Sequence, residues 1–368
     1  MSFFKSIFRK KESKPSVVKS KKQTDAVLTI KNIERLIDTA VKIEFEVPAE
    51  LEQEFKFIPG QYLNLTLNIN GKEEVRSYSI CSGLNEALAI GVKKVENGLV
   101  SAFLNETLKV GDEVRVSFPI GNFTLSEKAG NYVAIAGGSG ITPILSISKS
   151  IHASDHQKLS LIYANRDEQS IMFENDISAF SPDKVSVTHV FSEQEKEGYL
   201  FGMMTEEMIT KIIKNDLSLL KSNGFYICGP EKMIINAQNV LKTFGVPDEK
   251  IFFELFTTPV EMEGKKEDVA SEKFEGIANV TVILDGEEEN FELERKGDTI
   301  LEEAESHGMD APYSCRGGIC STCKAKVLEG TAIMDKNFTL TDEEVAEGYI
   351  LTCQAHPNSA KVVVSFDE

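Results

Sequence analysis

The sequence predicts a multidomain chain that joins an antiparallel β-barrel, a doubly wound α/β domain and a small α+β domain. Three observations support this prediction. Alternating polar and apolar residues run from Ala26 to about Phe123, apolar strands alternate with helical patterns from Asn131 to about Thr258, and a loop with three closely spaced cysteines follows. A length of 368 residues also fits two or three domains, since a domain usually takes roughly 100 to 200 residues.

The first region has the pattern of a small barrel. Residues 41–47 and 62–69 alternate with period two, as half-buried strands do. Turn signals separate such strands at Pro59-Gly60, Asn70-Gly71 and Gly111-Asp112. These short, regularly spaced strands predict a closed antiparallel sheet.

Two pieces of this region can carry chemistry. In the strand Arg76-Ser77-Tyr78-Ser79, Arg76 and Tyr78 share one face, and Ser77 and Ser79 share the other. Gly98-Leu99-Val100-Ser101 opens a helical stretch, where free N–H groups and a hydroxyl can receive a phosphate. Both strings are short and gain meaning from the segments that follow them.

The second region predicts a parallel sheet with helices on both faces. Its predicted strands are residues 132–136, 159–163, 185–190 and 224–228. The loop Gly137-Gly138-Ser139-Gly140-Ile141-Thr142-Pro143 follows the first strand and turns into a helix that runs through Ile151. Cys228-Gly229-Pro230 follows the fourth strand. Ligands of such sheets bind outside the carboxyl ends of the strands, where both loops lie, although the first loop lacks G-x-G-x-x-G spacing.

A charged segment with no apolar period, residues 259–275, predicts a flexible linker to the last domain. That domain begins with a hairpin, in which residues 280–284, the turn Asp285-Gly286 and residues 291–294 follow one another. A helical turn at 299–304, the cysteine loop and a final strand at 362–366 complete the pattern.

Cys315, Cys320 and Cys323 have C-x4-C-x2-C spacing, and Cys353 lies downstream. This is the plant-type [2Fe-2S] pattern, in which a glycine-bearing loop folds around the cluster. The main alternative is a structural zinc site, but zinc usually takes two C-x2–4-C pairs and Cys353 stands alone. A Rieske centre would need two C-x-H pairs, and a disulfide framework would need a secreted chain. The sequence therefore predicts Cys315, Cys320, Cys323 and Cys353 as cluster ligands.

The composition of the chain indicates which partners it can bind and in which cellular compartment we expect it. The chain is 41% hydrophobic and 27% charged, and no apolar run approaches the ~20 residues of a membrane span. A formal charge of -18 argues against nucleic acid and anionic membrane as main partners. No secretory signal is evident, and Cys81 and Cys228 remain as free thiols, which predicts a reducing, cytoplasmic location.

Residues 1–23 carry eight Lys or Arg and one Glu. We expect a disordered basic tail. Because Phe4 and Phe8 are spaced i,i+4, a short amphipathic helix that touches a membrane or a partner is the alternative.

In this order, the strings Arg-x-Tyr-Ser, Gly-x-x-Ser, Gly-Gly-Ser-Gly-Ile-Thr-Pro, Cys-Gly-Pro and the cysteine loop resemble the ferredoxin-NADP reductase superfamily with a C-terminal plant-type ferredoxin. Strings such as Tyr163-Ala164-Asn165-Arg166 and Glu254-Leu255-Phe256 are similar to those of reductase components of phenylacetyl-CoA epoxidases and, next, of phenol-hydroxylase-type reductases. The resemblance covers about residues 24–368. The tail at 1–23 is not part of the family pattern. The resemblance implies an FAD-binding barrel at 24–128, an NAD(P)-binding domain at 129–258 and, after the linker at 259–275, a β-grasp 2Fe-2S ferredoxin domain at 276–368.

The resemblance also implies roles for single residues. Arg76 would bind flavin phosphate, Tyr78 would pack on the isoalloxazine, and Ser79 would lie near its reactive nitrogen. Cys228 would approach the nicotinamide and Phe256 would cover the flavin, so that Ser79, Cys228 and Phe256 form the catalytic set. The implied cofactor-binding residues are Arg76, Ser77, Tyr78, Ser79, Gly98, Ser101, Gly137, Gly138, Ser139, Gly140, Ile141, Thr142, Asn165, Arg166, Cys228, Gly229 and Pro230. Three of these residues also have a purely structural alternative. Cys228 could be an inert buried thiol, Phe256 a residue of the hydrophobic core, and Ser101 an ordinary helix residue.

The number of electrons that each cofactor exchanges explains why the three predicted domains belong together. A nicotinamide gives up two electrons as a hydride and a [2Fe-2S] cluster takes one at a time, so a flavin must stand between them. The predicted path runs from NAD(P)H through flavin to the cluster and on to an oxygenase component. Arg166 after the second strand favours NADPH over NADH. The alternatives are a reductase for another oxygenase or a desaturase, and a non-catalytic iron-sulfur carrier.

Residues 276–368 hold 19 Asp and Glu against 7 Lys and Arg, a net charge of -12. Opposite charges steer protein encounters. We therefore expect the last domain to approach a basic patch on its oxygenase.

Overall fold

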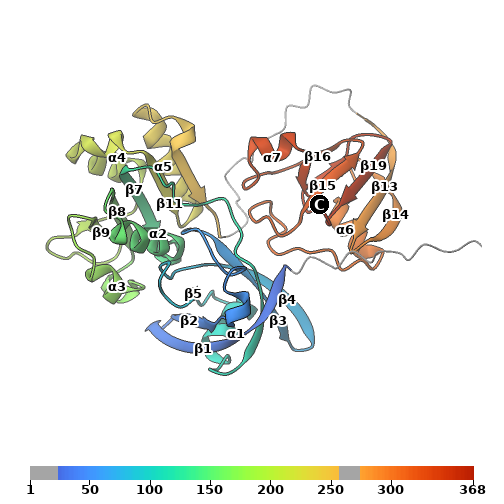
Figure 1. Cartoon of the computed structure of the whole chain (residues 1–368). Coiled ribbons are helices and arrows are strands. Elements are labelled where there is room, and N and C mark those ends of the chain that lie inside the picture. Colours follow the sequence, from blue (N-terminus) through green and yellow to red (C-terminus); the bar gives the residue numbers. More distant parts are fainter. Residues whose placement is uncertain (1–23, 257–273) are drawn as a thin grey trace, which may run out of the picture.

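The computed structural model describes residues 24–256 and 274–368, which form three bodies of secondary structure in chain order (Figure 1). The predicted tail at 1–23 lies outside the described residues, as does the predicted linker except for Phe274 and Glu275. In the part of the chain that the structure describes, no helix combines the length and apolar character needed for a membrane span.

A six-stranded antiparallel sheet, blue to cyan in Figure 1, curls into the predicted barrel in the order β4-β3-β6-β1-β2-β5. A bridge between Ile80, just after β4, and Ile90 on β5 joins the two ends of the sheet. Apolar side chains of alternate positions fill its interior, including Leu28, Ile43 and Leu65. The elements are β1 (Asp25–Ile37), β2 (Ala40–Glu46), β3 (Tyr62–Ile69), β4 (Lys72–Ser79), β5 (Ala89–Lys93), α1 (Leu99–Glu106) and β6 (Glu113–Ser117).

The second body is a parallel sheet in the order β10-β9-β8-β7-β11-β12. Apolar residues of α2 and α3 pack on one face together with the barrel residues Cys81 and Phe123, and residues of α4 and α5 pack on the other face. The predicted doubly wound arrangement is therefore present. The elements are β7 (Gly130–Gly137), α2 (Ile141–Ala153), β8 (Gln157–Asn165), α3 (Glu174–Ser178), β9 (Val185–Phe191), β10 (Leu200–Phe201), α4 (Glu206–Asn215), β11 (Gly224–Cys228), α5 (Glu231–Thr243) and β12 (Ile251–Glu254).

The third body, orange to red in Figure 1, is a mixed sheet in the order β14-β13-β19-β15-β17 with a separate β16-β18 pair. Its apolar core includes Cys323 and Cys353. The elements are β13 (Ile277–Leu284), β14 (Glu287–Glu294), α6 (Ile300–Ser306), β15 (Lys324–Glu329), β16 (Ala332–Met334), α7 (Asp342–Ala346), β17 (Tyr349–Leu351), β18 (Ala355–Pro357) and β19 (Lys361–Ser365). Short 3₁₀ helices elsewhere are η1 (Ala49–Leu51), η2 (Gly138–Gly140), η3 (Glu168–Ser170), η4 (Leu217–Lys221) and η5 (Asp248–Lys250).

The predicted multidomain fold class is confirmed, and several details differ from the prediction, among them the unpredicted strands β10 and β15 to β18. The second strand of the last domain's hairpin begins at Glu287 rather than at Phe291, because Asp285 and Gly286 make a two-residue turn with positive φ and Leu284 pairs directly with Glu287. The strand β12 was not predicted, since its run Ile251-Phe252-Phe253-Glu254 shows no alternation and is only four residues long.

Candidate functional site

The barrel strand β4 presents its predicted residues on alternate faces. Tyr78 is half-buried against the barrel core, and the Arg76 side chain is 48% exposed and lies 3.1 Å from the carboxylate of Glu74. Ser79 on the opposite face is buried. Arg76 is therefore accessible to an anionic group, and Ser79 lies inside a closed environment.

A buried contact joins the barrel to the parallel sheet. The hydroxyl of Ser79 donates a hydrogen bond of 3.1 Å to Glu254 Oε2, and Glu254 pairs in register with Cys228 across β12 and β11. Burial raises the pKa of Glu254 from 4.5 to about 8, although the Ser79 hydrogen bond favours the charged form. The structure thus brings Ser79, Cys228 and Glu254 together.

Glu254 was missing from the predicted site. The sequence signal that could have found it is a single carboxylate at the end of the apolar run Ile251-Phe252-Phe253. Phe256, two residues later, is 42% exposed, so the alternative that it is simple core is wrong. Cys228 is fully buried, and burial raises the pKa of its thiol well above the ordinary value.

The loop after β7 packs directly on the end of β11. A Cβ atom at Gly140 would lie 2.1 Å from the carbonyl oxygen of Cys228, so only glycine permits this approach. The Thr142 hydroxyl donates to the carbonyl of Ser139, and Ile141 is fully buried in the core. Ile141 can therefore face a ligand only through its backbone.

At the start of α1, the predicted phosphate residues hold their own loop together. Gly98 is the N-terminal cap of the helix, and no side chain caps it. The Ser101 hydroxyl accepts the N–H of Val95 at 3.0 Å and donates to the carbonyl of Gly98 at 3.2 Å. Ser101 thus stabilises the turn into the helix, and the backbone N–H groups at the helix N-terminus carry the partial positive charge that favours anions.

At the carboxyl end of β8, Asn165 is 8% exposed, and its amide nitrogen and oxygen have no hydrogen-bond partner among the described residues. Buried amides normally have partners, so this side chain fits a bound polar ligand. Arg166 beside it is exposed, while Asp167 accepts the N–H of Ser170 as the cap of η3.

Lys93 was also missing from the predicted site. Its Nζ atom lies 3.7 Å from the position that a Cβ of Gly138 would take. Burial lowers the pKa of Lys93, and the positive charge of Arg166 lowers it further. A cation from the barrel therefore lies at this loop, within electrostatic reach of Arg166. Nothing in the local sequence around Lys93 on β5 signals this approach.

The four predicted cluster cysteines form two pairs. Cys323 Sγ lies 3.2 Å from Cys353 Sγ, and the thiol of Cys320 hydrogen-bonds to Cys315. The N–H of Gly317 also donates to Cys315 Sγ. No three His, Cys, Asp or Glu side chains of the described ranges gather for a single metal ion, and all six cysteines are free thiols. One thiol pair within the loop, a second that joins the loop to Cys353, and the N–H of Gly317 on Cys315 fit the two irons of a [2Fe-2S] cluster.

The loop that carries Cys315, Cys320 and Cys323, called the cluster loop below, lies against the barrel. Ser77, a predicted cofactor residue, donates to Asn64 Oδ1 at 2.7 Å and lies 3.3 Å from the hydroxyl of Ser314. The hydroxyl of Ser77 therefore faces the third domain. The cluster loop and the Ser79–Glu254 contact approach the same β3–β4 face.

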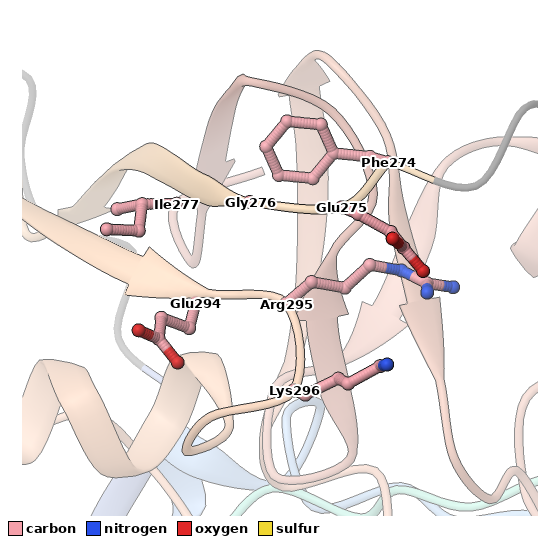
Figure 2. A pocket seen from close by; sticks show the side chains of 7 residues that line it. All are labelled: Phe274, Glu275, Gly276, Ile277, Glu294, Arg295 and Lys296. Carbon is pink, nitrogen blue, oxygen red and sulfur yellow. The ribbon is translucent and has the colours of Figure 1, made fainter.

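Two surface pockets lie away from this site. A pocket of about 290 Å³ lies on the third body (Figure 2), and its lining residues are Phe274, Glu275, Gly276, Ile277, Glu294, Arg295 and Lys296. A second of about 730 Å³ is lined by barrel loops and α2, including Glu86 and Lys149. Neither lining contains a predicted site residue, so the site is defined by convergent side chains.

Known families match each body. Residues 27–125 match the oxidoreductase FAD-binding domain, residues 134–239 the oxidoreductase NAD-binding domain, and residues 282–358 the 2Fe-2S iron-sulfur cluster binding domain. The thiol pairs, the orphaned amide of Asn165 and the helix N-terminus of α1 fit these groups. The chain therefore binds FAD, NAD(P)H and a [2Fe-2S] cluster.

Two curated relatives extend over nearly the whole chain. One is a component of the 1,2-phenylacetyl-CoA epoxidase of Escherichia coli K12, which is 36% identical over 92% of this chain and 97% of its own length. The ferredoxin reductase component of a 3-ketosteroid-9-alpha-monooxygenase from Rhodococcus rhodochrous is 31% identical over 92% of this chain and 96% of its own.

Solved structures share the fold. Phthalate dioxygenase reductase, 23% identical, covers 93% of this chain with 98% of its own and has a TM-score of 0.56. An intact type IV self-sufficient cytochrome P450 monooxygenase, 22% identical, covers 92% of this chain with 41% of its own and has a TM-score of 0.69. By its domains and its relatives, the chain belongs to the ferredoxin-NADP reductase superfamily, among the reductases that end in a 2Fe-2S domain.

Proposed function

We propose that this chain is the reductase component of a multicomponent oxygenase of the phenylacetyl-CoA epoxidase type. Electrons pass from NAD(P)H through FAD to the [2Fe-2S] cluster and on to the oxygenase component. The observation that carries the proposal is the convergence of Ser79, Glu254 and Cys228 beside the barrel face on which the cluster loop lies. The 36% identity to a component of a phenylacetyl-CoA epoxidase over nearly the full length supports the choice of partner.

The proposal gives each body a cofactor. The barrel, residues 24–128, holds FAD with Arg76, Tyr78, Ser79 and the N-terminus of α1. Residues 129–258 hold the nicotinamide nucleotide with the Gly138–Thr142 loop and Asn165, and Lys93 joins this set as a cation from the barrel. Residues 276–368 hold the cluster with their four cysteines. Because the cluster ligands must remain reduced thiolates, we place the protein in the cytoplasm.

When bound, FAD links the two-electron hydride chemistry of NAD(P)H to the one-electron chemistry of the cluster. The residues of this chain supply position and protons. With its pKa raised to about 8, Glu254 holds a proton at neutral pH and can exchange it through the hydroxyl of Ser79. The Cys228 thiol, whose pKa is raised, stays neutral and fills the end of β11.

Replacing Cys320 with Ser tests the order of the electron path. The change removes a cluster ligand, while the flavin and nucleotide residues lie in other bodies. We expect Cys320→Ser to keep FAD and NAD(P)H-dependent reduction of a two-electron dye, and to lose nearly all reduction of the oxygenase. Arg76→Ala should weaken FAD retention and lose both activities. If the cluster-free variant reduced the oxygenase at a rate near the wild type, the flavin would be the direct donor.

We further propose a preference for NADPH. Arg166 is exposed at the end of β8, where a cation can meet the 2′-phosphate, and the carboxylate of Asp167 is engaged as a helix cap. Arg166→Ala should lower the NADPH-to-NADH ratio of kcat/KM by about 10-fold, as the loss of one ~1.4 kcal/mol contact would. An unchanged ratio would remove the basis for this preference, and Lys158→Ala on the same strand is the control.

Two alternatives predict other results. A reductase for another oxygenase is favoured by the 31% identity to the 3-ketosteroid monooxygenase component. Comparing the rates with which the reduced protein reduces candidate oxygenases decides between these partners. A non-catalytic iron-sulfur carrier, which would purify without FAD, does not fit the FAD-binding and NAD-binding domains that residues 27–125 and 134–239 match.

A further inference from the structure

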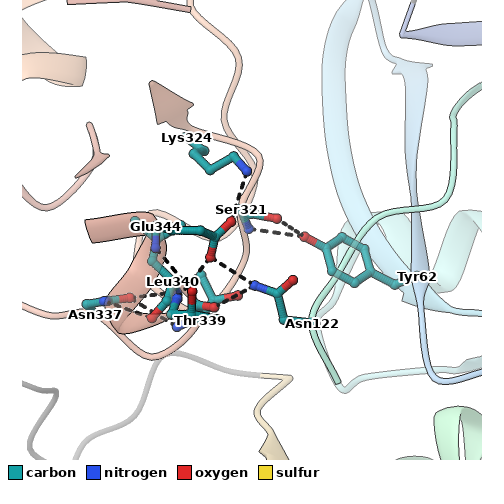
Figure 3. A network of polar contacts seen from close by, with 9 residues as sticks. Tyr62, Asn122, Ser321, Lys324, Asn337, Thr339, Leu340 and Glu344 are labelled. Carbon is teal, nitrogen blue, oxygen red and sulfur yellow. Dashed lines mark hydrogen bonds and ion pairs between the residues drawn. The ribbon is translucent and has the colours of Figure 1, made fainter. Parts of the chain in front are cut away.

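Hydrogen bonds between uncharged groups seat the cluster loop on the β3–β4 face of the barrel. The hydroxyl of Tyr62 accepts the backbone N–H of Ser321 at 3.1 Å and lies 3.0 Å from the Ser321 hydroxyl (Figure 3). Asn64 donates to the Thr322 hydroxyl at 2.9 Å. The residues that these contacts join are 259 and 258 positions apart in the chain.

Tyr62 is held rigidly for this contact. It is 5% exposed, and its backbone N–H and carbonyl exchange hydrogen bonds with Ile120 at 2.9 and 3.0 Å. Its ring lies against Gly121, where a Cβ atom would come within 2.8 Å of the ring carbons, and Gly121 has a φ of +115°. Only glycine combines this backbone conformation with this approach. The phenol oxygen is thus fixed before the cluster loop meets it.

Tyr62 also stands between the two redox sites. It pairs in register with Ser79 on β4, and Ser79 contacts Glu254 at 3.1 Å. On its other side, Ser321 directly follows the cluster ligand Cys320, which is 4% exposed. One side chain therefore links the flavin end of the barrel strands to the backbone next to a cluster cysteine.

We propose that Tyr62 is a positioning residue for internal electron transfer. By binding the N–H of Ser321, its hydroxyl sets the separation between the cluster and the flavin face of the barrel. This inference rests on the proposed electron path and goes beyond it by naming the contact that fixes the path's geometry. It requires no change in the charge of Tyr62.

Other contacts of the same interface lie around Tyr62. Ile319 and Phe338 pack against the apolar cluster of the parallel sheet, and Asn122 donates to the Thr339 carbonyl and to Glu344, both at 3.1 Å. These contacts keep the third domain beside the parallel sheet and the loop of Asn122 when the Tyr62 hydroxyl is removed. Loss of the hydroxyl should thus loosen the cluster loop without releasing the domain.

The test compares Tyr62→Phe, which keeps the ring, with Ser321→Ala, which keeps the backbone N–H. Tyr349→Phe on β17 of the third domain serves as the control, because it removes a tyrosine hydroxyl away from the Tyr62 contact. The full-length holoprotein is mixed with NADPH in a stopped-flow instrument, and the flavin and cluster absorbance bands are followed separately. Hydrogen exchange of the oxidised protein and the reduction potential of the cluster are measured in parallel.

We expect Tyr62→Phe to retain FAD, iron and the cluster potential, and to keep the rate of flavin reduction. Its cluster reduction should slow by about 10-fold, as the loss of a partner for a buried N–H predicts. Exchange of the Ser321 amide should accelerate while that of β13 and β14 is unchanged. Ser321→Ala should slow cluster reduction less than Tyr62→Phe does, because one of the two bonds remains.

Unchanged cluster reduction and unchanged exchange in Tyr62→Phe would overturn the inference. So would an equal slowing of flavin and cluster reduction, which would place Tyr62 in the flavin site instead. A failure of the proposed function gives a different result, because then NADPH would leave the wild-type cluster oxidised. The exchange measurement would still decide whether Tyr62 holds the loop.

Discussion

At the scale of single residues, the environment of one carboxyl group determines how the site handles protons. Glu254 ends a four-residue strand, and its neighbours Ser79 and Cys228 come from two other strands. Burial disfavours the carboxylate more than the single hydrogen bond from Ser79 favours it, so its pKa rises from 4.5 to about 8. A proton therefore stays beside Ser79 at the pH of the cell.

Replacing Glu254 with Gln should remove a pH-dependent part of both stability and activity. Between pH 4.5 and about 8 the unfolded chain loses this proton while the folded chain keeps it. The contribution of Glu254 to stability is thus complete below pH 4.5 and lost as the pH rises through about 8. Relative to the variant, the wild type should lose roughly 5 kcal/mol over this range in urea unfolding, at about 1.4 kcal/mol for each pH unit between the two pKa values.

Dye reduction by the wild type should also change near pH 8, whereas the profile of Glu254→Gln should be flat there and its rate at pH 7 lower by roughly 100-fold. Glu249→Gln, an exposed position in η5, is the control and should resemble the wild type. Parallel pH profiles for wild type and Glu254→Gln would show that this carboxyl does not titrate in the range.

At the scale of elements, the loop between β7 and α2 depends on how closely it meets β11. The Cys228 carbonyl and the backbone of Gly140 are in direct contact, which places the Gly138–Thr142 loop over Cys228-Gly229-Pro230. Both strands are central in the parallel sheet and pair in register from Gly224 to Cys228. A shift of the loop would therefore disturb the nucleotide edge of the sheet.

Gly140→Ala should separate these elements, because its Cβ would lie 2.1 Å from a backbone oxygen that cannot move aside. We expect a loss of about 1–3 kcal/mol of stability, as for overpacking, and a raised KM for NADPH. Thermal unfolding and steady-state kinetics measure the two effects. Gly224→Ala is the matched control, since its Cβ would meet the Phe252 ring at 3.2 Å, a side chain that can adjust. Equal effects of the two substitutions would contradict the argument.

At the scale of the whole molecule, the third domain has two electron-transfer contacts, one with the barrel and one with the oxygenase. They differ in how many charged groups they involve. Its acidic excess of -12 is carried by exposed residues that include Glu287, Glu292, Glu302 and Glu343. Its contact with the barrel at Tyr62 and Asn64 uses hydroxyl and amide groups. Encounter with a partner should therefore depend on ionic strength, and internal transfer should not.

Raising salt from ~0.05 to ~0.5 M should slow reduction of the oxygenase by about 10-fold or more, because screening weakens the attraction to a basic patch. Reduction of small dyes and internal reduction of the cluster should stay within about 2-fold. The three rates are measured on one preparation across the salt series. Equal salt dependence of all three would mean that steering by the acidic surface does not govern the encounter.

Much of the fold and part of the site could be predicted from the sequence, because they depend on local spacing. The period-two alternation at Tyr62–Ile69 marked β3 within its bounds, and the glycine loop after β7 marked the turn into α2. The spacing of Cys315, Cys320 and Cys323 indicated a cluster loop, and the structure pairs Cys315 with Cys320 and Cys323 with the downstream Cys353. Each of these features is set by backbone geometry over a few residues.

Only the tertiary structure decided which distant groups meet. Ser79 and Glu254 are 175 positions apart, and Tyr62 and Ser321 are 259 apart, so no local pattern relates them. Glu254 and Lys93 become site residues because strand order and domain packing bury them beside Ser79 and Gly138. A carboxyl or an amine in an extended chain has its ordinary pKa, and burial together with its neighbours changes that value. The sequence by itself therefore predicted the fold class, the turns and the spacing of the cluster cysteines, and the packing of three bodies decided which distant side chains meet.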